Sequence, residues 1–255
     1  MSGPVLLVSV RDADEVAAAV AGGAAIIDIK DPGRGSLGRP SAENLVPSAA
    51  AVPAGLPWTL AAGELQECSG PGDDRFQQLL ATLGRPPAAV KFGLSGCSGT
   101  DWLTPLRQAA ARLPPGTPAV PVAYADARQA AAPPVLQVID RAARAGLPPV
   151  LIDTYDKQAS GSLLTLIPPA ELNDLISRAR AAGLGILLAG RLALNEIPVV
   201  AGCQPDAVAV RSAVCRGGRL GRIDRPRVAT AVDHCRRVAG VRVPFRLFRQ
   251  QGVSG

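Results

Sequence analysis

The sequence predicts a single (β/α)8 barrel formed by residues 1–240. Short runs rich in Val, Ile and Leu alternate with longer alanine-rich amphipathic stretches, which is the pattern of parallel βα units. Eight such pairs can be counted, and a length of 255 residues suits an α/β barrel built as one unit. No GxGxxG motif follows the first apolar run, which argues against a dinucleotide-binding half. An open doubly wound sheet is the alternative fold.

Each expected strand is a short apolar run that ends at a turn signal, and the eight strands cover residues 6–10, 25–30, 58–63, 88–94, 119–125, 149–154, 185–190 and 207–213. The expected helices lie between them, at residues 12–21, 41–50, 73–83, 101–113, 133–145, 169–182, 193–201 and 224–239. Asp12, Ser41, Asp101 and Asp224 stand where an N-cap or a first-turn acid stabilises a helix.

Residues 241–255 follow the last expected helix and have no place in the eightfold repeat. They contain several arginines and two phenylalanines. We expect a basic tail that is mobile or bridges subunits of a homo-oligomer, with a basic and aromatic binding arm as the alternative.

The net charge of +6 and the isoelectric point near 9.5 favour anionic partners, among them phosphorylated metabolites, nucleic acids and acidic lipid surfaces. Aromatic residues are not interleaved with the arginines of the barrel segment 210–225, so we expect no nucleic-acid partner and consider a catalytically silent nucleic-acid-binding barrel the weakest alternative. No apolar run approaches the roughly 20 residues that span a bilayer, so we expect no membrane partner. Five cysteines without CxxC spacing indicate reduced thiols in a cytoplasmic protein, without a disulfide framework or a zinc site.

Only three lysines occur among the 27 basic residues, and the other 24 are arginines. Lys30, Lys91 and Lys157 each stand at or just beyond the end of an expected strand, where the active sites of β/α barrels lie. An amine can lose its proton and attack a carbonyl group, whereas a guanidinium group stays charged. These positions favour Schiff-base chemistry, although chance survival of three lysines during drift toward arginine is the alternative.

Acidic and phenolic side chains are expected at the same mouth of the barrel, after several different strands: Asp28, Glu64, Tyr124, Asp126 and Asp153. Asp28 and Lys30 share one side of their strand, because side chains alternate with a period of two. The carboxylates could simply compensate buried charge. A cluster of amines and carboxylates from several strands is also suited to proton transfer around an imine.

The last two loops after strands are rich in glycine and arginine, which is typical of phosphate sites in barrel enzymes. Ordinary turns are the alternative interpretation of these glycines. The candidate ligands of a phosphorylated small-molecule substrate are Gly190, Arg191, Arg211, Ser212, Gly217 and Gly218. Outside this cluster, His234, Cys97 and Cys215 lie in no catalytic motif, and we expect neither a metal nor another cofactor.

Several of these segments, taken in order and spacing, resemble the (5-formylfuran-3-yl)methyl phosphate synthase family. The segments are DIKDPGRGSLG (28–38), AAVKFGL (88–94), VAYADA (122–127), LIDTYDK (151–157), LLAG (187–190) and VRSAVCRGGRLGRIDR (210–225). The resemblance covers roughly residues 5–240. It implies a (β/α)8 barrel related to class I aldolases, and a lyase that acts in methanofuran biosynthesis. Such an enzyme condenses two molecules of glyceraldehyde 3-phosphate with loss of phosphate and water.

Carried over position by position, the resemblance implies that Lys30 forms the Schiff base and that Lys91 accepts a proton. Asp28, Asp153 and Lys157 match supporting residues of the same site. The chain departs from the family pattern at Ser212, where glycine is usual, and at Arg191, where a small residue is usual, and both departures lie at the phosphate end of the site. A different class I aldolase or lyase acting on a phosphorylated carbonyl compound is therefore the alternative function.

Overall fold

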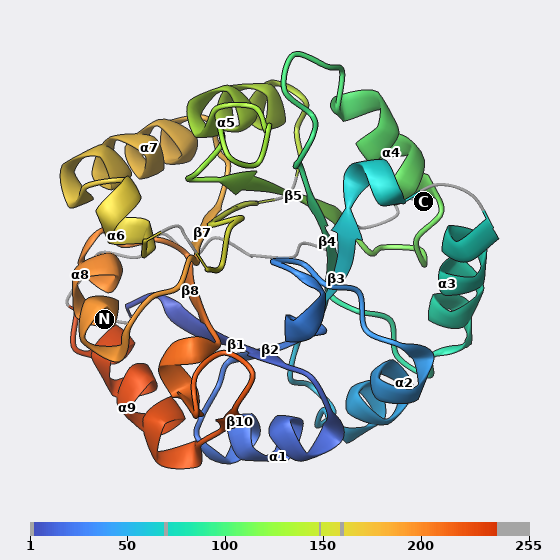
Figure 1. Ribbon diagram of the computed structural model, residues 1–255, viewed down its shortest axis with the longest axis vertical. Helices are drawn as coiled ribbons and strands as arrows, with labels where there is room; N and C mark the ends of the chain where they lie inside the picture. The colour runs from blue at the N-terminus through green and yellow to red at the C-terminus, as the bar shows by residue number, and fades with distance from the viewer. Residues whose placement is uncertain (1–2, 69–70, 148, 159–160, 239–255) are drawn as a thin grey trace, which may run out of the picture.

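A computed structural model describes residues 3–68, 71–147, 149–158 and 161–238. Its strands close into a barrel in the order β1 to β8, with neighbouring strands parallel and helices around the outside (Figure 1). The expected (β/α)8 barrel is thereby confirmed, and the open doubly wound sheet is wrong. The predicted tail at residues 241–255 lies outside the described residues.

The eight barrel strands are β1 Val5–Val10, β2 Ile26–Ile29, β3 Trp58–Glu64, β4 Ala89–Gly93, β5 Ala119–Tyr124, β6 Val150–Asp153, β7 Ile186–Leu188 and β8 Ala207–Val210. The helices are α1 Ala13–Ala21, α2 Ala42–Ala51, α3 Pro71–Thr82, α4 Leu103–Ala111, α5 Val135–Arg144, α6 Leu163–Leu166, α7 Pro169–Ala181, α8 Ile197–Gly202 and α9 Arg225–Arg236. Four short 3₁₀ segments also occur, η1 Pro32–Arg34, η2 Leu65–Glu67, η3 Leu194–Glu196 and η4 Ser212–Val214.

Two features of the β/α repeat were not expected. The predicted strand at 207–213 ends at Val210, because the chain turns into η4 at Ser212. A two-stranded antiparallel hairpin then follows, β9 Cys215–Arg216 and β10 Arg222–Ile223, before α9 begins. This hairpin lies at the carboxyl end of the barrel strands, so it is placed to shape the site.

Helix α5 illustrates how the sequence pattern produces the outer layer. Its buried residues Val135, Val138, Ile139 and Ala142 follow the spacing i, i+3, i+4 and i+7, which places them on one face. The same periodicity on the other helices packs them against the outward side chains of the strands. Of the predicted start signals, Asp12 and Asp224 accept hydrogen bonds as N-caps, whereas Ser41 occupies its N-cap position without a side-chain hydrogen bond.

The inside of the barrel forms a second, smaller core of mostly small and branched side chains, including Leu7, Val122, Leu151 and Leu187. This packing fills much of the barrel, and the buried polar side chains Lys30, Lys91 and Asp153 lie toward the carboxyl ends of the strands. Within the described residues, no helix is long and apolar enough to cross a membrane.

Candidate active site

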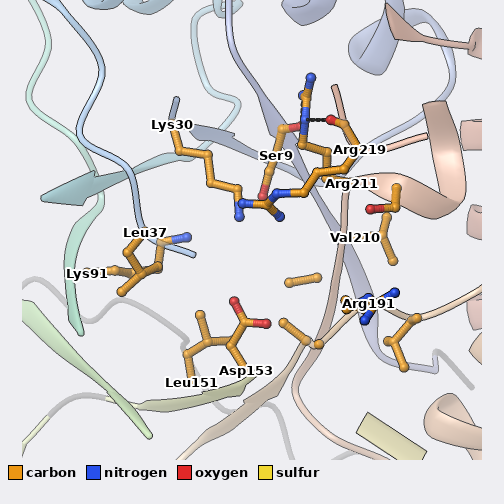
Figure 2. Close-up of a pocket in the computed structure, with 15 residues that line it drawn as sticks. Ser9, Lys30, Leu37, Lys91, Leu151, Asp153, Arg191, Val210, Arg211 and Arg219 are labelled. Carbon is orange, nitrogen blue, oxygen red and sulfur yellow. Dashed lines mark hydrogen bonds between the residues drawn. The ribbon is translucent and has the colours of Figure 1, made fainter. Parts of the chain in front are cut away.

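The cavity at the carboxyl ends of the strands is lined by Lys30, Lys91 and Asp153, together with residues of the loops after β7 and β8 (Figure 2). Lys30 follows the last residue of β2, and its backbone N–H still pairs with Val10 of β1. The side chain therefore leaves the rigid end of a strand and points into the barrel mouth. Two of the three lysines predicted at this mouth, Lys30 and Lys91, thus line one cavity.

Lys30 is buried, and its Nζ atom donates a hydrogen bond to the backbone oxygen of Ser36, 3.1 Å away. Among the described residues, no carboxylate lies within 4.0 Å of this amine. Burial lowers the pKa of Lys30 from 10.5 to about 7, and the nearby charge of Arg219 adds to that effect, against the opposing attraction of Asp153. Near neutral pH a large fraction of this amine is thus unprotonated, as a nucleophile requires.

Lys91 lies on β4 and forms an ion pair with Asp28 of β2, with 2.6 Å between Nζ and Oδ1. Asp28 is fully buried and also accepts hydrogen bonds from Ser9 and Thr59. The expectation that Asp28 and Lys30 share one side of β2 stands, but the ion-pair partner of Asp28 is Lys91. Three groups therefore contact one carboxylate deep in the barrel, and the ion pair and the two hydrogen bonds compensate its burial.

Lys157 comes from the loop after β6 and pairs with Asp153 at the end of the same strand, at 2.6 Å. Its Nζ atom also donates to the hydroxyl and backbone oxygen of Thr154. Burial by itself would raise the pKa of Asp153, but Lys157 and Lys30 hold it at about 2. Asp153 is therefore ionised and lies between two amines.

Ser36, in the loop after η1, connects the two sides of the mouth. Its hydroxyl contacts the carboxylate of Asp153 at 3.1 Å and the backbone oxygen of Thr154 at 2.9 Å, while its backbone oxygen accepts from Lys30. The loop after β2 is thus tied across the barrel to β6. Sequence reasoning missed Ser36 as a site residue, although it lies within the segment DIKDPGRGSLG.

Glu64 and Tyr124 lie side by side at the ends of β3 and β5, with a 2.6 Å hydrogen bond from the phenol to Oε1. The backbone N–H of Ser95 donates to the other carboxylate oxygen at 3.0 Å. Burial raises the pKa of Glu64 and raises that of Tyr124 well above 10. The pair thus provides a protonatable carboxyl group beside Ser36 and Asp153 at the mouth.

Asp126 lies close to the site, where it stabilises the backbone of the loop after β6. Its two carboxylate oxygens accept hydrogen bonds from the backbone N–H groups of Tyr155 and Asp156, at 2.7 and 2.9 Å. Those residues immediately precede Lys157 in the chain. Asp126 therefore shapes the loop that presents Lys157 to Asp153.

The expected phosphate ligands separate into two groups in the structure. Gly190, Arg191 and Ser212 line the cavity. Gly217 and Gly218 lie in the exposed turn between β9 and β10, with φ values of 82° and 75°, where glycine avoids the strain that other residues meet. These two glycines are therefore placed to form the hairpin, not to line the cavity.

Arg211 lines the cavity with its backbone region, but its guanidinium group points into the protein. It forms a buried ion pair with Glu15, at 2.7 Å, and donates to the backbone oxygens of Ser9, Arg219 and Gly221. Five contacts engage all its N–H groups. The geometry thus corrects the expectation for Arg211: it holds the β9–β10 hairpin against β1 and α1, and its donors are not available to a phosphate.

Arg219 is the cation that sequence reasoning did not single out. It lies in the turn of the hairpin and lines the cavity, where its side chain extends toward Lys30 (Figure 2). The sequence indicates only that the segment VRSAVCRGGRLGRIDR is rich in arginine. It does not distinguish which of these arginines lines the cavity. Only the path of the hairpin selects Arg219.

The other reactive side chains lie apart from this chemistry. Burial raises the pKa of the Cys97 and Cys215 thiols, which disfavours their nucleophilic form. His234 contacts the backbone oxygen of Leu194 at 3.1 Å, in the outer layer. Within the described parts of the chain, no group of three or more His, Cys, Asp or Glu side chains is arranged to hold a metal ion.

The fold and the cavity together indicate a β/α-barrel enzyme, because active sites of such enzymes lie at this face, where Lys30, Lys91 and Asp153 line the cavity and Lys157 pairs with Asp153. The model of the 4-HFC-P synthase family matches residues 6–232 of this chain. The chain therefore belongs to this family.

Named relatives agree with that assignment. The (5-formylfuran-3-yl)methyl phosphate synthase of Methanocaldococcus jannaschii is 30% identical over 250 residues, covering 91% of this chain and 100% of the relative. The synthase of the same name from Methanococcus maripaludis strain S2 is 30% identical over 238 residues, covering 91% and 99%. A Methylorubrum extorquens protein that carries this name provisionally is 35% identical over 242 residues, covering 91% and 92%.

Solved structures show similarity of fold. The phosphoribosylanthranilate isomerase of Thermotoga maritima has a TM-score of 0.59 at 14% identity, covering 91% of this chain and 98% of that chain. The (S)-3-O-geranylgeranylglyceryl phosphate synthase of Thermoplasma acidophilum has a TM-score of 0.59 at 13% identity, covering 92% and 94%. At these identities the comparison supports the barrel fold alone.

Proposed function

We propose that this protein is a Schiff-base lyase that condenses two molecules of glyceraldehyde 3-phosphate into (5-formylfuran-3-yl)methyl phosphate. The reaction releases one phosphate and two waters, and its product would supply the furan of a methanofuran-type C1 carrier. The names of the relatives support the product. The observation that carries the mechanism is the state of Lys30, a buried amine with a pKa of about 7 and no ion-pair partner among the described residues.

In the proposed first step, the neutral amine of Lys30 attacks the aldehyde carbon of one triose phosphate. Loss of water forms the imine, and the oxygen of the carbonyl leaves with protons supplied from the Asp153–Lys157 pair. Lys157 is suited to this role because it contacts Asp153 directly, and Asp153 lies between Lys157 and Lys30.

The imine then acidifies the neighbouring C–H bond, and a base must take that proton. We assign this step to the Lys91–Asp28 pair, which is buried at the bottom of the cavity below Lys30. The resulting enamine then forms the new C–C bond with the second triose phosphate. Elimination of phosphate and of a further water requires an acid, and Glu64 is suited to it because burial raises its pKa.

Trapping with borohydride tests the imine step. Reduction in the presence of glyceraldehyde 3-phosphate should attach the triose covalently to the peptide that contains Lys30, as measured by mass spectrometry. Lys30→Arg keeps the charge and loses the nucleophile, so it should abolish the adduct. Lys91→Arg is the matched control, since it should retain the adduct and lose the furan product. An adduct that persists in Lys30→Arg would contradict the assignment.

A product assay tests the overall reaction. The purified protein incubated with glyceraldehyde 3-phosphate alone should release inorganic phosphate and develop the ultraviolet absorbance of a furan aldehyde. Phosphate release without a furan would instead identify another class I aldolase or lyase.

A further inference from the structure

The guanidinium group of Arg219 is held at the cavity by two contacts with one loop. Its Nε atom donates to the backbone oxygen of Pro32 at 3.3 Å, and Nη2 donates to that of Gly35 at 2.5 Å. Both acceptors lie in the loop that follows Lys30. Among the described residues, the Nη1 atom makes no hydrogen bond, so its donors remain available on the cavity side.

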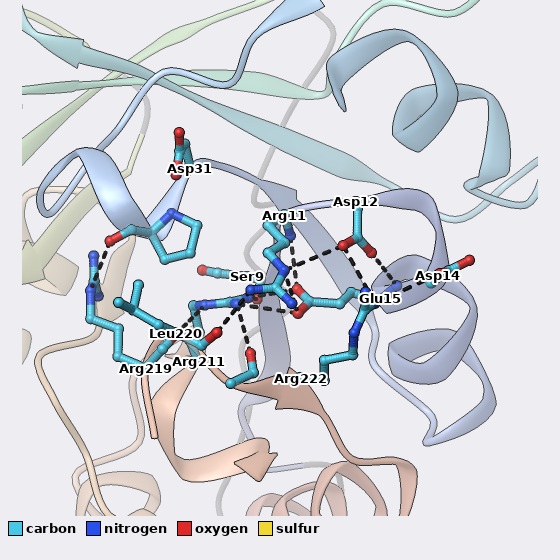
Figure 3. A network of polar contacts seen from close by, with 12 residues as sticks. Ser9, Arg11, Asp12, Asp14, Glu15, Asp31, Arg211, Arg219, Leu220 and Arg222 are labelled. Atoms are coloured by element: carbon cyan, nitrogen blue, oxygen red, sulfur yellow. Dashed lines mark hydrogen bonds and ion pairs between the residues drawn. The ribbon is translucent and has the colours of Figure 1, made fainter. Parts of the chain in front are cut away.

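The backbone of Arg219 is fixed from the opposite side by Arg211. Arg211 donates to the backbone oxygen of Arg219 at 2.8 Å, and Glu15 holds Arg211 in turn through a buried ion pair (Figure 3). Arg11 adds a hydrogen bond to the neighbouring Leu220 at 2.8 Å. The hairpin turn is therefore pre-organised, and Arg219 has little freedom to leave the mouth.

The charges at the mouth are not balanced. Lys91 and Lys157 each have a carboxylate partner at 2.6 Å, whereas neither Lys30 nor Arg219 has one within 4.0 Å among the described residues. Burial and the charge of Arg219 both lower the pKa of Lys30, and burial lowers the pKa of Arg219 itself. A largely buried guanidinium group without a carboxylate in direct contact is costly. An anion bound to Arg219 would remove that cost.

We propose that Arg219 binds the phosphate group of the compound that reacts with Lys30, and thereby selects phosphorylated over neutral aldehydes. The inference rests on the proposed imine at Lys30 and names the residue that recognises its substrate. The aldehyde carbon bonds to Nζ of Lys30 while the phosphate, at the other end of a three-carbon chain, accepts hydrogen bonds from the guanidinium. Arg211 and Glu15 are positioning residues that act through the backbone of the hairpin.

The experiment compares two aldehydes that differ only in the phosphate. Borohydride trapping at Lys30 is measured with glyceraldehyde 3-phosphate and with glyceraldehyde, at about pH 9, where the amine is largely neutral. In Arg219→Gln the preference for the phosphorylated compound should fall about 10- to 100-fold, the range expected for a lost charge-assisted contact. Trapping of glyceraldehyde should stay near the wild-type rate, which also shows that the variant is folded.

Two further variants sharpen the comparison. Arg222→Gln removes a charge from the same hairpin, but Arg222 is exposed and contacts Asp12 and Asp14 at 3.6 Å, away from the cavity. It should keep the wild-type preference. Arg219→Lys keeps a cation and should recover part of the preference.

The alternative role for Arg219 is purely structural, as a tether of the loop at Pro32 and Gly35. In that case Arg219→Gln would slow trapping of both aldehydes equally, and the unchanged ratio would overturn the proposal. Equal loss of preference in Arg222→Gln would overturn it as well, because it would indicate a general field effect. Absence of any adduct in the wild-type protein would reject the imine mechanism and this inference together.

Discussion

Lys30 and Arg219 show how a single residue acquires its chemistry from neighbours distant in the chain. Lys30 and Arg219 are near opposite ends of the barrel sequence, yet both side chains line the same cavity. Burial is the larger influence on Lys30, and the adjacent guanidinium acts in the same direction. A lysine placed at the end of a strand is common, whereas a lysine with a pKa of about 7 needs this enclosure.

The pH dependence of imine formation follows from that pKa. The neutral amine attacks the aldehyde, so the rate of borohydride trapping should be level above about pH 7 and fall roughly tenfold per pH unit below it. The expected midpoint near 7 compares with 10.5 for an ordinary lysine. Measuring the trapping rate with glyceraldehyde across this range checks the prediction. A midpoint near 10.5 would show that Lys30 is not perturbed.

At the scale of one element, a register shift in β3 orients Glu64. The pairing of β3 with β4 shifts between Ala61 and Glu64, and Gly63 within this irregularity has a φ of 98°. The shift brings the carboxylate of Glu64 over β4, where Gly93 leaves room for it. The strand itself was expected from its apolar pattern, but the bulge was not, because it depends on the partner strand.

Gly93→Ala tests this packing. A Cβ atom at Gly93 would lie 2.1 Å from Oε2 of Glu64 and 2.4 Å from the hydroxyl of Tyr124, so the Tyr124–Glu64 hydrogen bond should break. We expect a loss of about 1–3 kcal/mol in the free energy of unfolding, measured by urea denaturation. Gly202→Ala is the matched control, since no atom lies within 4 Å of the added group. Equal effects of the two substitutions would contradict the packing argument.

The hairpin β9–β10 is the element that sequence reasoning failed to find. Each of its strands has two residues, too short for an alternating pattern to be recognised. The sequence pattern instead predicts a longer strand, 207–213, followed by a phosphate loop. As a consequence Arg211 was expected to bind phosphate, whereas the turn carries Arg219 into the cavity and directs Arg211 toward Glu15.

In the whole molecule, the first and last βα units meet where β1 pairs with β8, as in the register Val5 with Ala207. The Glu15–Arg211 ion pair joins the same two units next to this seam (Figure 3). Both side chains are 1–2% exposed, and Arg211 depends on Glu15 for compensation, whereas Glu15 also pairs with Arg11 at 3.2 Å. This contact closes the barrel and fixes the hairpin at the same time.

Glu15→Gln should therefore destabilise the whole barrel. It would leave the buried guanidinium of Arg211 without a counter-charge, at a cost of about 3–5 kcal/mol in the free energy of unfolding. Urea denaturation followed by circular dichroism measures the change. Asp14→Asn, on the same helix but 86% exposed, should alter stability by less than about 0.5 kcal/mol. A similarly small effect of Glu15→Gln would show that the seam does not depend on this pair.

By itself, the sequence determined the barrel and the gathering of the three lysines at one mouth. Apolar periodicity and turn residues are local signals, and the order of parallel βα units places all strand ends on the same face. The tertiary structure alone decided that Asp28 pairs with Lys91, that Asp153 pairs with Lys157, and that Arg219 faces Lys30. The reason is that ion pairing, desolvation and the shift of a pKa depend on distances between side chains from separate strands and loops, which periodicity along the chain does not specify.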